Sequence, residues 1–205
     1  MGYLTPEESW QVIASQRLAL AALLEGLTPQ QWAAASLCSQ WRVRDVAAHV
    51  ALASQPLGWS LVRDAVRARG NFDRLNRDVA IRAFPAPGEI VAVLRRDASS
   101  RRLPFVTNHR NIVPDILVHG QDIAVPLGLD HPMPLEAARA GAAHVWEMGW
   151  PFHARRRLRG MTLTATDTDW SAGAGDREVT GPIAVLLLLL TGRTAAARPH
   201  LSGWR

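Results

Sequence analysis

The sequence predicts a mainly α-helical protein, with a helical bundle over residues 1–155 and a small α+β segment over residues 156–205. Apolar residues recur at helical spacing through the first region, and capping signals mark several helix starts. From Gly160 the pattern changes to an alternation with period two, which is typical of a half-buried strand. The composition, 48% hydrophobic and 20% charged, is ordinary for a globular chain, and 205 residues suffice for one core with a small appendage.

Local signals define the helices of the first region. Thr5-Pro-Glu-Glu8 has the pattern of a capping box with Pro at the first helical position, and Thr28-Pro-Gln-Gln31 repeats it. Gly26 marks the end of the first helix, and Pro56 is expected to interrupt a later one. In order, helices are expected over about residues 5–25, 28–32, 43–53, 57–68, 73–83, 89–99, 111–125 and 134–148.

The last 45 residues have a different sequence pattern. Met161-Thr-Leu-Thr-Ala-Thr166 predicts a strand, and residues 178–180 predict a second short one. Between them, residues 167–175 are polar and glycine-rich, as in a connection. The apolar run over residues 182–190 predicts a buried helix that ends at Gly192.

The sequence argues against a membrane partner and against secretion. The longest apolar run, around residues 183–190, is about half of the ~20 residues that a membrane span needs. The first residues lack the basic and apolar regions of a secretion signal. We therefore expect a cytoplasmic protein.

The positive charge does not indicate a nucleic-acid partner. The net charge is +5 and every basic residue is Arg, but these residues are scattered along the chain rather than gathered on one face. A helix-turn-helix over residues 28–49 would leave Val46 and Val50 in water, which disfavours that reading. Solvated helix faces explain the arginines better.

The most informative motif is Asp115-Ile-Leu-Val-His119-Gly-Gln-Asp122. On a helix, Asp115 and His119 lie one turn apart on the same side, and Asp122 extends their stripe. Such a pair is often accidental, and a lone His such as His49 is more often a core or surface residue than a ligand. Apolar residues surround both segments, however, and buried charges are costly unless they are paired or metal-bound. We therefore predict one polar cavity in which His49, Asp115 and His119 bind a metal.

The remaining candidates carry weaker signals. Cys38 is the single cysteine, so an internal disulfide and a multi-cysteine metal cluster are excluded, and we interpret it as an inert buried thiol rather than a nucleophile. Trp41 is interpreted as a core residue. Five histidines lack partner spacing and are expected at the surface or in loops: His109, His131, His144, His153 and His200.

Two stretches carry a resemblance to a known family. Trp41-Arg-Val-Arg-Asp-Val-Ala-Ala-His49 and Asp115-Ile-Leu-Val-His-Gly-Gln-Asp-Ile-Ala-Val-Pro-Leu-Gly128 resemble the signature segments of the mycothiol-dependent maleylpyruvate isomerases. Residues 165–170 and 181–193 are similar to that family's C-terminal segment. The resemblance implies a DinB-like four-helix bundle in which His49, Asp115 and His119 bind zinc, or another divalent metal such as nickel. This chain has Asp115 where better-known members have Glu.

The resemblance also implies a reaction and supporting residues. A metal-bound thiol, suspected to be mycothiol, would act as thiolate on a small electrophile, so an isomerase or S-transferase is expected. Asp45 and Asp122 would hold the ligands in place, although Asp45 could equally serve the helix start and Asp122 an Arg. Arg193, near the end of the apolar helix, is a candidate for contacting an anionic group, but arginines also favour helix ends for structural reasons.

Other interpretations stay open at this point. The chain could be a non-catalytic DinB-like module that binds a metal or a small ligand, or a metal-bound water could make it a hydrolase. The C-terminal segment is expected to be shorter than that of the isomerases. Either a monomer or a homodimer is compatible with the sequence.

Overall fold

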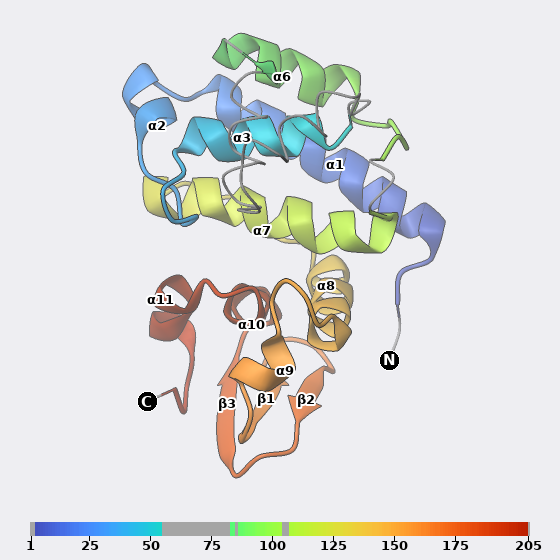
Figure 1. Ribbon diagram of the computed structural model, residues 1–205, viewed down its shortest axis with the longest axis vertical. Coiled ribbons are helices and arrows are strands. Elements are labelled where there is room, and N and C mark those ends of the chain that lie inside the picture. The colour runs from blue at the N-terminus through green and yellow to red at the C-terminus, as the bar shows by residue number, and fades with distance from the viewer. Residues whose placement is uncertain (1–2, 55–82, 85, 104–106, 205) are drawn as a thin grey trace, which may run out of the picture. The chain divides into compact units, whose positions relative to one another are not determined.

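The computed structural model describes residues 3–54, 83–84, 86–103 and 107–204, and these divide into two compact units (Figure 1). One unit spans residues 13–131, and the other spans residues 132–205 together with residues 1–12. The chain is mainly α-helical and has a small sheet near the C-terminus, so the predicted fold class is confirmed. The helix expected over residues 57–68 and nearly all of that expected over residues 73–83 lie outside the described residues.

Among the described residues, four helices of ten residues or more and one short helix contribute to the first unit, in keeping with a four-helix bundle. α3 (Val43–Leu52) packs against both α6 (Pro87–Arg96) and α7 (His109–Leu127). α1 (Pro6–Glu25) enters this unit at residue 13, and α2 (Pro29–Ala33) leads into α3. The core of this unit is apolar and includes Ile13, Leu20, Leu24, Val46, Val50, Ile90, Leu94, Ile116, Leu117 and Ile123.

The predicted helix starts are confirmed at atomic detail. The backbone N–H and hydroxyl of Thr5 both donate to Glu8 Oε2, and the Glu8 N–H donates to Thr5 Oγ1. Thr28 and Gln31 form the same reciprocal pair at the start of α2. Each capping box satisfies backbone donors that a helix start leaves without an intrahelical acceptor. These signals are local, which explains why the sequence revealed them.

A buried arginine ties α1 to the end of α6. Arg17 is 1% exposed, and its Nη1 donates to the carbonyls of Asp97, Ala98 and Ser100 at 3.0, 3.3 and 2.8 Å. Burial lowers the pKa of Arg17, and the charge of Asp97 opposes that shift. The carbonyls at a helix end lack intrahelical partners, so one guanidinium satisfies several of them at once.

α7 is longer than predicted. It begins at His109, two residues before the expected start, because the Asn108 side chain accepts a hydrogen bond from the Asn111 N–H at 3.2 Å. It ends at Leu127, where Gly128 adopts φ 63° and its N–H reaches the carbonyls of Ala124 and Val125. The motif from Asp115 to Asp122 therefore lies in the middle of the helix, away from its ends.

The second unit combines a helical pair with a small sheet. α8 (Leu135–Glu147) packs against the apolar α10 (Ile183–Leu190), and small residues on α8 permit a close approach. β1 (Met161–Ala165) is central, antiparallel to β2 (Ser171–Gly173) and parallel to β3 (Arg177–Gly181). Short helices α9 (Ala154–Arg157) and α11 (Thr194–Ala197) and a 3₁₀ turn (Arg198–His200) complete it.

The two strands that were predicted occur, and β2 is an addition within the stretch expected to be a connection. The compact units divide at Pro132, because α8 packs with the C-terminal elements, whereas the predicted boundary lies at residue 155. The division at residue 155 stays a prediction.

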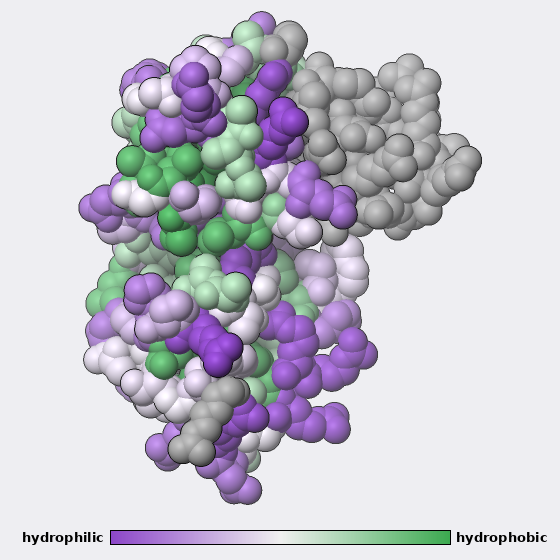
Figure 2. Space-filling view, turned by 90° about the vertical axis from the view of Figure 1, so that its left-hand side faces the viewer, coloured by the Kyte–Doolittle hydropathy of each residue, from purple (hydrophilic) through white to green (hydrophobic). Residues whose placement is uncertain are grey.

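Among the described residues, none of the helices is both long and apolar enough to cross a membrane. The face seen in Figure 2 mixes hydrophilic and apolar residues over its coloured atoms.

Candidate metal centre

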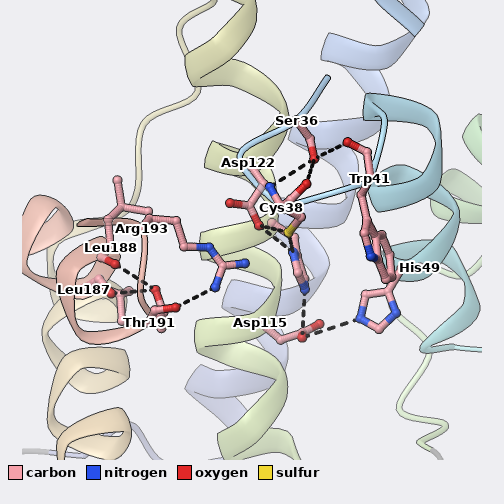
Figure 3. A network of polar contacts seen from close by, with 11 residues as sticks. Ser36, Cys38, Trp41, His49, Asp115, Asp122, Leu187, Leu188, Thr191 and Arg193 are labelled. Atoms are coloured by element: carbon pink, nitrogen blue, oxygen red, sulfur yellow. Dashed lines mark hydrogen bonds and ion pairs between the residues drawn. The ribbon is translucent and has the colours of Figure 1, made fainter. Parts of the chain in front are cut away.

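α3 and α7 bring the three predicted ligands together. Asp115 Oδ1 lies 3.4 Å from His119 Nε2 and 3.8 Å from His49 Nε2 (Figure 3). The two imidazole rings stand nearly perpendicular, with centroids 5.0 Å apart and an interplanar angle of 77°. One donor atom from each residue lies within 4.8 Å of the other two, and all three side chains are partly exposed. Two segments more than 60 residues apart in sequence therefore converge on one point.

The separations fit one divalent cation. Bonds of about 2.1 Å in a tetrahedral site place neighbouring ligand atoms about 3.4 Å apart. The two measured distances to Asp115 Oδ1 lie close to that edge length. Asp115 thus reaches both imidazoles despite its side chain being one methylene shorter than that of Glu. Two nitrogens and one oxygen form a donor set that suits zinc and its neighbours in the first transition row.

The charges of these residues are strongly coupled. Burial alone would raise the pKa of Asp115, but attraction to His119 and hydrogen bonds to His119 and His49 hold it well below its usual range. Burial alone would lower the pKa of His119, but Asp115 and hydrogen bonds to Asp122 and Cys38 raise it well above its ordinary value. Without a metal, a proton on His119 is thus the counterion of Asp115.

Asp122 lies behind His119. Its Oδ2 is 2.8 Å from His119 Nδ1, and its side chain has no exposed surface. A carboxylate in this place favours the tautomer with the proton on Nδ1, which leaves Nε2 free to bind a metal beside Asp115. The contact is the one expected of a residue that orients a metal-binding histidine. The role itself stays a prediction.

Cys38 is a part of this region that sequence reasoning missed. Its Sγ lies 3.0 Å from Asp122 Oδ2 and 3.9 Å from His119 Nδ1, and the residue is only partly buried. The expectation of an inert buried thiol did not foresee these polar contacts. Cys38 and Asp122 are 84 residues apart, so no local spacing could have linked them.

Asp45 takes part in the start of α3. Its Oδ2 accepts a hydrogen bond from the Arg42 N–H at 3.0 Å, and the side chain is buried. This is the geometry of a capping group at the third helical position. This hydrogen bond supports the alternative in which Asp45 caps the start of α3. An orienting role for Asp45 toward His49 stays a prediction.

The structure also shows the surroundings of Arg193 and His131. Arg193 lies in the second compact unit, where its Nη1 donates to the Thr191 carbonyl at 2.8 Å; its catalytic role stays a prediction. His131 lies in a loop, which is one of the two expected alternatives, but only 6% of it is exposed, so it is not a surface residue. His131 packs against Gly120 of α7, which has no side chain, and its carbonyl accepts a hydrogen bond from Gln121. Burial lowers the pKa of His131, and Asp130 opposes that shift.

Comparison with known proteins finds one matching family model and two solved structures of the same fold. Residues 13–105 match the family model described as the mycothiol maleylpyruvate isomerase N-terminal domain. A crystal structure of a histidine-to-alanine mutant of the mycothiol-dependent maleylpyruvate isomerase superposes with a TM-score of 0.65 at 15% identity, covering 98% of this chain and 95% of that one. A second crystal structure of that isomerase gives a TM-score of 0.58 at 16% identity, covering 94% and 92%. No curated protein sequence matches this chain.

These comparisons confirm the resemblance and correct one expectation. The match includes 95% of the length of the first solved chain, so the C-terminal segment is not shortened to the extent expected. At these identities the two structures establish the fold only.

Proposed function

We propose, from the match of residues 13–105 to the mycothiol maleylpyruvate isomerase N-terminal domain, that the protein is a divalent-metal-dependent enzyme that uses mycothiol. We propose zinc, or nickel in its place, as the metal. The reaction would be isomerisation or S-transfer on a small electrophile, with the cofactor thiolate as the attacking group. The partners are then a small thiol and a small electrophilic substrate.

The convergence of His49, Asp115 and His119 supports this proposal most strongly. Three nitrogen and oxygen ligands leave one position of a tetrahedral site open, which is the arrangement of catalytic rather than structural zinc. The partial exposure of all three side chains leaves room for a ligand from solvent to approach. A metal bound there would supply charge that keeps a thiol deprotonated near neutral pH.

The chain's own residues prepare the site for that chemistry. Asp115 stays ionised because both imidazoles hydrogen-bond to it, so it is ready to act as a ligand without losing a proton first. Asp122 holds the Nδ1 side of His119 and thereby directs Nε2 toward Asp115. Arg193 is proposed separately, from its place near the end of the apolar helix, to contact an anionic group, and a rise in KM when it is replaced would support that role.

Metal content tests the proposal directly. We expect purified wild-type protein to contain close to one zinc or nickel per chain, and His49→Ala and His119→Ala to lose it. His200→Ala is a matched control, because His200 is exposed on the 3₁₀ turn of the other compact unit. Equal trace amounts of metal in all four proteins would refute the metal site.

A second experiment tests the use of a thiol. Mycothiol titrated into the metal-loaded protein should raise the thermal unfolding midpoint, because a ligand that binds only the folded state stabilises it. The same titration on metal-free protein should give a much smaller shift. A metal-loaded protein whose midpoint does not move with mycothiol would contradict the thiol-dependent function and favour the non-catalytic module.

A further inference from the structure

We propose that Cys38 is a positioning residue of the metal centre, which acts through Asp122 to fix the orientation of His119. The inference rests on the proposed function, since it concerns the affinity of the same site for a metal. It assigns a role to the single cysteine, which had no role in the site derived above. The proposal concerns hydrogen bonding and requires no reaction at the thiol.

The contacts define a chain of three groups. Cys38 Sγ lies 3.0 Å from Asp122 Oδ2, and the same oxygen lies 2.8 Å from His119 Nδ1. One carboxylate oxygen therefore accepts from the thiol and faces the imidazole at once. Because Asp122 has no exposed surface, water cannot replace the thiol as a donor without entering the interior. Removing the thiol would leave this buried oxygen with one donor fewer.

A tight loop fixes where the thiol lies. Ser36 Oγ accepts from the Cys38 N–H at 3.1 Å and donates to the Trp41 carbonyl at 2.9 Å. The Trp41 N–H closes the turn on the Cys38 carbonyl at 3.0 Å. The Leu37 N–H donates to the Asp122 backbone carbonyl at 3.1 Å, so the loop is attached to α7 at the residue that Cys38 contacts.

The same loop also supports the other histidine. Trp41, at the end of the loop, meets the His49 ring edge to face with centroids 5.7 Å apart (Figure 3). Trp41 is half-buried rather than deep in the core, so it forms one side of the site. Residues 36–41 thus place a thiol behind one ligand and an indole beside the other. Cys38 supplies the polar contact in this arrangement.

Three variants test the proposal through metal affinity. Cys38→Ala removes the donor, Cys38→Ser restores a hydroxyl donor of similar size, and Asp122→Asn removes the carboxylate. Loss of a group that orients a metal-binding histidine typically weakens binding 10- to 100-fold, so we expect a loss in that range for Asp122→Asn and about tenfold for Cys38→Ala. Cys38→Ser should recover part of the loss. Ser39→Ala, an exposed position in the same loop, is the matched control and should bind as wild type does.

The double variant distinguishes positioning from a general structural effect. If Cys38 acts through Asp122, adding Cys38→Ala to Asp122→Asn should weaken zinc binding no further. The visible spectrum of the cobalt-substituted protein should change in Cys38→Ala and not in Ser39→Ala, because it reports ligand geometry rather than folding. Unchanged affinity in Cys38→Ala, or fully additive losses in the double variant, would overturn the proposal.

A readout on metal-free protein separates this proposal from the function on which it rests. The side-chain nitrogen resonances of His119 should shift in Cys38→Ala and in Asp122→Asn, and stay in place in Ser39→Ala. Wild-type protein that binds no metal would refute the proposed function, whereas these shifts would still establish the contact through Asp122. Resonances of His119 that are unchanged in Cys38→Ala would overturn the positioning role, whatever the metal content.

Discussion

Acidification should weaken metal binding by an amount that the charges of the site determine. A metal needs the lone pair of His119 Nε2, but the pKa of His119 is raised well above its ordinary value. Each bound metal must therefore displace a proton from His119 at any pH below that raised pKa. Asp115 contributes no proton, because its own pKa is held far below neutrality. The apparent dissociation constant should then rise about tenfold for each pH unit lowered, or more steeply if further protons are displaced.

The assay is a zinc competition titration against a coloured chelator at several values between about pH 5.5 and pH 7.5, corrected for the chelator's own protonation. Adding zinc to weakly buffered protein near neutral pH should also release about one proton for each metal bound. The direction of this pH dependence follows from the raised pKa of His119, because protons compete with the metal for His119 below that pKa and cease to compete above it. An affinity that is constant over this range, with no proton released, would refute the coupling of Asp115 and His119.

Three substitutions test the structural part of the account. Arg17→Met should lower the free energy of unfolding by about 3 kcal/mol in urea titrations, because three carbonyls at the end of α6 lose a charged donor. A loss under about 1 kcal/mol would contradict a stabilising role for these Arg17 hydrogen bonds. Asp45→Ala should cost about 1 kcal/mol through the Arg42 cap while metal content stays unchanged, whereas lost metal would favour an orienting role. Gly120→Ala should lower the free energy of unfolding by about 1–3 kcal/mol, because the added Cβ would lie 2.6 Å from the His131 ring. Adding His131→Ala should remove most of that cost, whereas additive losses would count against the contact.

Elements whose signals are local could be read from the sequence. The capping boxes at Thr5 and Thr28 lie within four residues, and the apolar run of α10 predicts a buried helix by itself. β2 could not be found in the same way, because three residues of glycine-rich chain become a strand only by pairing with β1. The early start of α7 depends on the side chain of Asn108, a single capping residue without a strong flanking pattern.

The same distinction applies to the site. Asp115 and His119 were predictable from their spacing on one helix, and His49 from a polar residue on a second apolar helix. The contact of Cys38 with Asp122 joins positions far apart in sequence, so only the packing of the 36–41 loop on α7 reveals it. The burial of His131 likewise depends on the absence of a side chain at Gly120. Helical spacing thus predicts candidate ligands on one helix, while the contacts that surround them depend on tertiary packing.

X-ray absorption spectroscopy of the zinc-loaded protein identifies the atoms that bind the metal and their distances. We expect a first coordination shell of nitrogen and oxygen at about 2.0–2.2 Å that contains two imidazoles, one of which is lost in His49→Ala and the other in His119→Ala. A sulfur ligand at about 2.3 Å in protein free of added thiol would place the metal on Cys38 instead. That result would contradict the assignment of His49, Asp115 and His119 as the metal centre.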